Sequence, residues 1–128
     1  IGRKLKLCYE PLHVSCVTDE KWLLFVIEQV LSNALKYTRA GSITIELEAP
    51  KTLVIRDTGI GVAPEDLPRI FEKGYTGYNG RGDQKASGLG LYLCRTICKR
   101  LGHTITASSV PDHGTAIRIT LEQRQVRE

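Results

Sequence analysis

The spacing of hydrophobic residues in the first half of the chain predicts one long helix followed by a pair of strands. Between residues 21 and 37 the apolar positions recur every three or four residues, as one face of an α-helix requires: Leu23, Val26, Ile27, Val30, Leu31 and Ala34. Asp19 stands where the N-cap of this helix belongs. Residues 42–49 alternate apolar and polar side chains, which is the period of a half-buried strand, and residues 52–56 follow closely enough to form a hairpin with them.

The flanking segments complete the predicted fold. Residues 4–18 predict two short strands interrupted near Pro11, and a short helix is expected over residues 64–71 because a proline opens it. A second long helix is expected over residues 89–101, with a closing hairpin over residues 103–121. The expected fold class is α+β, a two-layer sandwich in which about three helices cover one face of a mixed sheet.

Composition supports one domain over residues 1–128. The chain has 128 residues, of which 41% are hydrophobic, and this is too few residues for two domains. We expect neither a membrane span nor a leader sequence in it. The net charge of +4 is scattered along the chain and aromatic residues make up only 6%, so nucleic acid is not an expected partner. A phosphate-rich ligand or an acidic protein suits this charge equally well.

The four cysteines do not have the spacing of a metal site. They are Cys8, Cys16, Cys94 and Cys98, and no CxxC motif occurs. The second pair shares a helical face with Ile97, which favours buried thiols over a zinc site. Reduced thiols in turn favour a reducing compartment such as the cytosol. The histidines lack neighbours that would complete a ligand set, and we interpret all of them as structural or surface residues: His13, His103 and His113.

The first long helix has a second stripe of residues that core packing does not require. Gln29, Asn33, Lys36 and Tyr37 follow at helical spacing beside the apolar stripe. They would line the edge of a cleft, although an ordinary solvated flank explains the same pattern. An asparagine oxygen can bind Mg²⁺ and a lysine can neutralise phosphate.

Two glycine clusters suggest sharp turns or close approaches of the backbone. In DTGIGV, residues 57–62, Asp57 ends a strand, and its carboxylate can accept a hydrogen bond from an exocyclic amine such as that of adenine. This motif alone is also an ordinary turn signal. SGLGL, residues 87–91, lacks the third glycine of a dinucleotide fingerprint, but it places glycines at a helix N-terminus, where an anion is favoured.

The order of five segments is far more specific than any one of them. SNALKYT, DTGIGV, IFEKGYTG, SGLGLYL and HGTAIRI resemble the N, G1, F and G2 boxes and the terminal Gly-Thr strand of the histidine-kinase ATPase domain. The resemblance extends from about residue 18 to residue 121. EKGYTGYNGR, followed by GLGLYL, most resembles the intramembrane-sensing kinases of Gram-positive bacteria that respond to peptide antibiotics.

The resemblance implies a recognition site for the base of ATP. Asp57 matches the residue that recognises the adenine amine, and Thr115 completes its polar pocket. Gly59 and Gly61 match the glycines that allow a close approach of the nucleotide. Tyr37 matches an aromatic residue packed near the nucleotide.

The resemblance also implies a phosphate and metal side, with Mg²⁺ as the metal. Asn33 matches the Mg²⁺ ligand, Lys36 a phosphate contact, and Lys73 a basic residue directed at the terminal phosphate, so these three form the expected catalytic set. Residues 74–88, which contain five glycines and no apolar periodicity, match the ATP lid. The remaining matches are Phe71 in the F box, Gly88 and Gly90 at the hinge between lid and helix, and Arg81 and Lys85 as cations of the lid.

Two departures from the family shape the functional hypothesis. Many superfamily members carry a water-activating glutamate four residues before the Mg²⁺ asparagine, but the residue here is Gln29, and Glu28 points about 100° away. An amide cannot act as a general base, so ATP is expected to be held for a histidine nucleophile. No histidine stands in a helical acceptor motif, so we expect the chain to be the catalytic fragment of a longer membrane kinase.

The resulting hypothesis is the catalytic domain of a bacterial two-component sensor histidine kinase, which transfers the γ-phosphoryl group of ATP to a histidine on an absent dimerisation domain. Expected partners are that phosphoacceptor domain and a response regulator, without membrane contact by this cytoplasmic fragment. Three alternatives keep nucleotide binding: an anti-sigma-type serine kinase, an ATPase clamp, and a nucleotide-sensing module without transfer. Phosphohistidine is acid-labile and phosphoserine is acid-stable, so the phosphoamino acid distinguishes the kinases.

Overall fold

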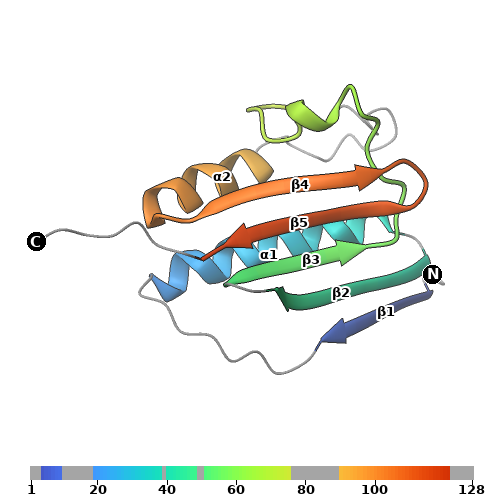
Figure 1. Cartoon of the computed structure of the whole chain (residues 1–128), viewed down its shortest axis with the longest axis horizontal. Helices are drawn as coiled ribbons and strands as arrows, with labels where there is room; N and C mark the ends of the chain where they lie inside the picture. Colours follow the sequence, from blue (N-terminus) through green and yellow to red (C-terminus); the bar gives the residue numbers. More distant parts are fainter. Residues whose placement is uncertain (1–3, 10–18, 39, 49–50, 76–89, 122–128) are drawn as a thin grey trace, which may run out of the picture.

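The alternating segments form a five-stranded sheet, and the two long apolar stripes form α-helices that cover one of its faces (Figure 1). The computed structural model describes residues 4–9, 19–38, 40–48, 51–75 and 90–121. The elements in chain order are β1 (Lys4–Tyr9), α1 (Glu20–Tyr37), β2 (Ala40–Glu48), β3 (Thr52–Asp57), the 3₁₀ turn η1 (Leu67–Arg69), α2 (Gly90–Leu101), β4 (Thr104–Val110) and β5 (Gly114–Thr120).

The sheet is mixed, as predicted. Its strand order is β1-β2-β3-β5-β4, with β1 parallel to β2 and every other neighbouring pair antiparallel. The hairpins β2–β3 and β4–β5 are the two that the sequence predicts. Of the two strands expected over residues 4–18, β1 is confirmed, and the second lies outside the described residues. The predicted α+β sandwich is therefore confirmed.

Both helices begin or end at residues with a clear local reason. The Asp19 side chain caps α1 by accepting hydrogen bonds from Lys21 N at 3.1 Å and Trp22 N at 3.3 Å. α2 ends before Gly102, whose φ of +83° suits glycine. The two α-helices match the predicted ranges to within one residue at each end.

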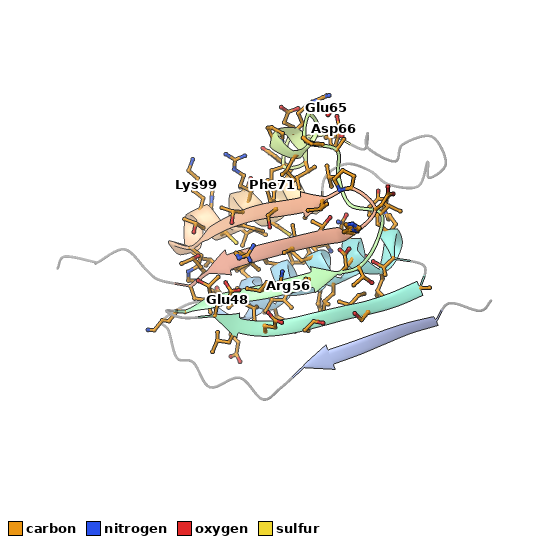
Figure 2. All side chains as sticks on the ribbon, turned by 45° about the vertical axis from the view of Figure 1, so that its right-hand side comes forward. Glu48, Arg56, Glu65, Asp66, Phe71 and Lys99 are labelled. Atoms are coloured by element: carbon orange, nitrogen blue, oxygen red, sulfur yellow. The ribbon has the colours of Figure 1, made fainter. Side chains whose placement is uncertain are left out.

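The two faces of the sheet differ because successive side chains of a strand point to opposite sides. The helix-covered face contributes buried core residues: Ile43, Leu53, Ile55, Ile105, Ile117 and Ile119. Figure 2 shows Glu48 and Arg56 on the face that is turned away from the helices. Arg56 Nη2 lies 3.4 Å from Glu46 Oε1, and Arg118 Nε lies 3.3 Å from Glu48 Oε1. This polar face is the solvent side, where such pairs contribute little to stability.

The short helix predicted over residues 64–71 is wrong in length and type. Only Leu67–Arg69 are helical, as a single 3₁₀ turn. Pro68 has no N–H and cannot donate to the carbonyl of Pro64, as a continuing α-helix would require. A turn replaces the helix, with Asp66 N donating to Ala63 O at 2.9 Å. The described residues therefore form two α-helices and one 3₁₀ turn, in place of about three helices.

The thiols of α2 are core side chains, as predicted. Cys94 and Cys98 are buried and free, and Cys94 Sγ donates to Val26 O on α1 at 3.7 Å. Burial, with a contribution from the neighbouring Cys98, raises the pKa of Cys94 to about 12, and burial raises that of Cys98 to about 11. Both thiols therefore stay protonated at neutral pH. Within the described ranges, no three His, Cys, Asp or Glu side chains gather as a metal site, and no helix is long and apolar enough to span a bilayer.

The structure describes two of the three histidines. His103 is buried just after α2, where its backbone N–H donates to Cys98 O at 2.8 Å, and burial lowers the pKa of its imidazole. His113 is exposed at the β4–β5 turn. Both positions agree with the prediction of structural or surface roles.

Candidate functional site

The ends of several elements meet at one end of the molecule. Cys94 on α2 contacts Val26 on α1, and a methyl group added to Gly90 would lie 3.2 Å from Gln29 Oε1. Contacts therefore move backward along α2 as they move forward along α1, and the two helices are antiparallel. The C-terminal end of α1 thus lies on the same side as the N-terminal end of α2, the end of β3 and the β4–β5 turn (Figure 1).

Asp57 places a buried carboxylate at this end. It is the last residue of β3, an interior strand of the sheet, and is only 9% exposed. Its Oδ1 accepts two backbone hydrogen bonds, from Gly59 N at 2.8 Å and from Thr115 N at 3.2 Å. Thr115 is its register partner on β5. One bond is local and the other crosses the sheet, so together they fix the carboxylate in place.

Burial raises the pKa of Asp57 above its ordinary value. Hydrogen bonds from the backbone N–H groups of Gly59 and Thr115 oppose this rise because they favour the ionised form. Thr38 is fully buried directly after α1. The protein thus keeps a partly desolvated acceptor group at this position at the expense of its own stability.

The glycines after β3 bring this loop against the backbone of the protein itself. A side chain at Gly59 would overlap the carbonyl of Tyr37, to which Ile60 N donates a hydrogen bond at 3.2 Å. Gly61 has a φ of +74°, and a side chain there would overlap the carbonyl of Val110. The two glycines therefore let the loop pack between the end of α1 and the β4–β5 turn, a structural role that the resemblance to the family did not imply.

Gly61→Ala is expected to lower the free energy of unfolding by about 2–4 kcal/mol, because left-handed backbone strain adds to the overlap with Val110. Gly74→Ala is the matched control, since its φ is +81° and nothing lies within 4 Å of the added methyl group. Only left-handed backbone strain acts at Gly74, so the free energy of unfolding is expected to fall by about 1 kcal/mol. Urea unfolding followed by the fluorescence of Trp22, the single tryptophan of the chain, measures both. Equal losses would show that the Val110 contact does not require glycine.

The polar flank of α1 is not uniform. Gln29 and Asn33 are half-buried, Lys36 is exposed and Tyr37 is buried, so Tyr37 does not line an open edge. Lys36 Nζ lies 5.9 Å from the centroid of the Tyr37 ring. Glu28 is exposed, whereas the Gln29 side chain reaches the first residue of α2. The side chains of Glu28 and Gln29 thus point in different directions, as the sequence predicts.

Phe71 and Lys73 follow η1 and meet α2. Phe71 belongs to the buried core, and the Arg95 guanidinium carbon lies 5.9 Å from the centroid of its ring. Lys73 is exposed, and its Nζ lies 5.8 Å from the centroid of the Tyr92 ring. The segment of the predicted F box therefore packs along the first half of α2.

Most of the predicted lid lies outside the described residues. Of residues 74–88, the structure describes Gly74 and Tyr75. The hinge glycine Gly88 and the lid cations Arg81 and Lys85 are not among them. Gly90, the other hinge residue, is the first residue of α2.

The motifs of the sequence predict no role for two polar residues of this region: Thr38, the last residue of SNALKYT, and Ser109. Ser109 Oγ accepts a hydrogen bond from Val62 N at 2.8 Å and donates one to Gly114 O at 2.8 Å. A signal for Ser109 does exist, because it shares the inward-facing side of β4 with the buried Ile105, where a polar residue needs a partner. Thr38 has no such signal, since it follows a helix end and has no strand alternation around it.

Similarity to known proteins decides the family. The family described as histidine kinase-, DNA gyrase B- and HSP90-like ATPase matches residues 18–125. The chain belongs to this ATPase family. ATP is therefore the nucleotide of this domain.

Curated relatives of this ATPase domain are sensor kinases. The sensor histidine kinase YxdK of Bacillus subtilis is 42% identical over an alignment of 108 residues that covers 80% of this chain and 33% of that protein. The sensor protein BceS of Halalkalibacterium halodurans is 42% identical over an alignment of 107 residues that covers 81% of this chain and 32% of that protein. The sensor protein kinase GraS of Staphylococcus aureus is 40% identical over an alignment of 105 residues that covers 80% of this chain and 30% of that protein. The chain spans about a third of the length of each relative.

Solved structures have the same fold as this ATPase domain. Full-length ShkA in complex with AMPPNP aligns with a TM-score of 0.77 and 23% identity, over 91% of this chain and 25% of that one. The mycobacterial sensor histidine kinase MprB aligns with a TM-score of 0.71 and 25% identity, over 91% of this chain and 80% of that one. Together with the family match and the similarity to the curated sensor kinases, this shared fold shows that the domain is homologous to the catalytic domains of sensor histidine kinases.

Proposed function

We propose that the chain is the catalytic domain of a sensor histidine kinase and transfers the γ-phosphoryl group of ATP to a histidine on another domain. The observation that carries the proposal is the buried carboxylate of Asp57, fixed at the end of β3 by two backbone hydrogen bonds. A desolvated acceptor with a fixed position suits recognition of a neutral donor such as the adenine amine. Both backbone bonds use Oδ1, so the other carboxylate oxygen is the natural acceptor for that amine.

The phosphate and metal side of the proposal rests on the facing ends of α1 and α2. The free amides and the dipole at the N-terminus of α2 favour an anion, and this terminus lies beside Gln29, one helical turn before Asn33. We assign Asn33 as the protein ligand of Mg²⁺, with Lys36 and Lys73 as phosphate contacts. Mg²⁺ fits this donor set because it commonly takes few protein ligands together with waters and phosphate oxygens. When bound, it would supply charge neutralisation to the transferred phosphoryl group.

The residue pattern on α1 supports a histidine acceptor over water. Gln29 cannot act as a general base, and the carboxylate of Glu28 is exposed on a different side of the helix. The chain can therefore bind and orient ATP without activating a water molecule. Phosphoryl transfer depends mainly on positioning and charge neutralisation, so an imidazole from an acceptor domain completes the reaction.

The wider context of the proposal follows from the relatives. The parent protein would be a membrane-bound sensor of the Gram-positive, peptide-antibiotic-responsive type, with this domain on the cytoplasmic side. It would dimerise through its phosphoacceptor domain and pass the phosphoryl group to a response regulator. Similarity to BceS and GraS, over about a third of their length, supports this assignment.

A calorimetric titration tests the nucleotide site. We expect an ATP analogue to bind this chain, more tightly with Mg²⁺ than without it, and GTP to bind poorly because its ring places a carbonyl where Asp57 needs a donor. Asn33→Ala should remove the Mg²⁺ dependence and leave Mg²⁺-free binding unchanged. Absence of binding would refute the proposal, and equal affinity for ATP and GTP would refute the role of Asp57.

A further inference from the structure

The Ser109 hydroxyl connects its own strand β4 to the neighbouring strand β5 and to the loop after β3, 47 positions earlier in the chain. It accepts a hydrogen bond from Val62 N at 2.8 Å, donates one to Gly114 O at 2.8 Å, and lies 3.0 Å from Thr115 Oγ1. Ser109 is the register partner of Thr115 on β5, as Thr115 is of Asp57 on β3. The three side chains therefore form a row across neighbouring strands, on the helix-covered face of the sheet.

The direction of the bond between the two hydroxyls follows from their partners. A hydroxyl has one proton to donate and two lone pairs to accept with. The carbonyl of Gly114 can only accept, so it takes the proton of Ser109, and Val62 N–H occupies one lone pair. The remaining lone pair of Ser109 faces Thr115, so the hydroxyl of Thr115 must be the donor in that bond.

Thr115 then has no proton left for any other partner. Its hydroxyl offers only lone pairs to any further partner. Its register partner on the same face, Asp57, carries a carboxylate that in its ionised form is also an acceptor without a proton. A ligand atom placed between the two side chains meets acceptors from both. It must therefore be a donor.

We propose that Ser109 is a positioning residue that sets the purine specificity of the site, by holding the Thr115 hydroxyl as an acceptor. This inference rests on the proposed ATP function and deepens it. A purine with an amine at position 6 supplies the required donor, whereas a purine with a carbonyl there places an acceptor against two acceptors. Without Ser109, the Thr115 hydroxyl can rotate and donate to such a carbonyl.

The test compares binding of ATP and inosine triphosphate, which carries a carbonyl at position 6, in the presence of Mg²⁺. The wild-type chain should prefer ATP. In Ser109→Ala this preference should fall by about fivefold to tenfold, which corresponds to one neutral hydrogen bond. Ser108→Ala is the matched control, because Ser108 is the neighbouring serine on the opposite face, where its Oγ accepts from Arg118 Nη1 at 3.0 Å. It should keep the wild-type preference.

Thr115 variants show whether Ser109 acts through the hydroxyl of Thr115. Thr115→Ser should keep the preference, and Thr115→Val should lower it. Adding Ser109→Ala to Thr115→Val should then change nothing further, because no hydroxyl remains to be oriented. A merely structural role of Ser109 would weaken ATP and inosine triphosphate equally and would add to the effect of Thr115→Val.

Folding of each variant is checked by thermal unfolding. Should Ser109→Ala fail to fold, Ser109→Cys retains a weak donor and acceptor at the same position, and its preference for ATP should also fall. A folded Ser109 variant with the wild-type preference would overturn the inference while leaving the ATP function intact. Failure of the wild-type chain to bind ATP at all would instead overturn the proposed function and the inference with it.

Discussion

Asp57→Asn is expected to weaken ATP binding on the order of tenfold to a hundredfold, and to make the nucleotide-free chain more stable at pH 7. Binding falls because the amide is a weaker acceptor than the carboxylate and brings an N–H₂ donor that faces the donor amine of adenine. Calorimetric titration with ATP measures this loss. Asp66→Asn, on the half-exposed Asp66 before η1, is the control and should bind ATP as the wild type does.

The gain in stability follows from the direction of the pKa shift. Burial raises the pKa of Asp57 in the folded state. Between the unfolded value of 3.8 and this raised value, the folded state holds more protons than the unfolded state, so stability falls as the pH rises. Above the raised pKa the loss is complete, and the ionised carboxylate destabilises the nucleotide-free fold.

Replacing the carboxylate by a neutral amide removes this penalty. The difference in unfolding free energy between Asp57→Asn and the wild type should therefore widen as the pH rises from about 4, and become constant above the raised pKa of Asp57. Chemical denaturation at several pH values measures the difference. A variant less stable than the wild type at pH 7 would show that the carboxylate is structural, and would remove the reason to regard it as a group retained for a ligand.

Asn33→Ala is expected to reduce phosphoryl transfer to an acceptor histidine by about a hundredfold or more, while the fold stays intact. Loss of a Mg²⁺ ligand affects charge neutralisation in the transition state directly. Asn33 is only half-buried and is not a member of the buried core, so its truncation should change the thermal midpoint little. Ser32→Ala, at the exposed neighbouring position, is the control for helix propensity.

The assay uses radiolabelled γ-phosphate and three samples: the chain alone, the chain with the helical acceptor domain of its parent kinase, and Asn33→Ala with that domain. We expect acid-labile label only in the second sample. Full transfer by Asn33→Ala would exclude Asn33 from the metal site. Acid-stable labelling of the chain alone would favour the serine-kinase alternative.

Elements with a local origin could be predicted from the sequence. The helical stripe of α1, its cap at Asp19 and the alternation of β2 each depend on residues within a few positions of one another, so covalent geometry alone produces the pattern. The boxes could also be found from the sequence, because each of them, such as DTGIGV, is a continuous stretch of residues. The interruption of the helix at Pro68 could also have been predicted, because proline has no N–H to donate. The helix predicted over residues 64–71 did not take this into account.

Only the tertiary structure decided which distant groups complete the site. Gly59 must be a glycine because the carbonyl of Tyr37, 22 positions earlier in the chain, occupies the space of a side chain. Ser109 meets Val62 across 47 positions and meets Thr115 only because β4 and β5 pair in one particular register. Contacts of this kind depend on how separate elements pack. No periodicity or motif in the chain encodes the direction of a hydroxyl proton, since that direction is set by whichever donors and acceptors the fold brings together.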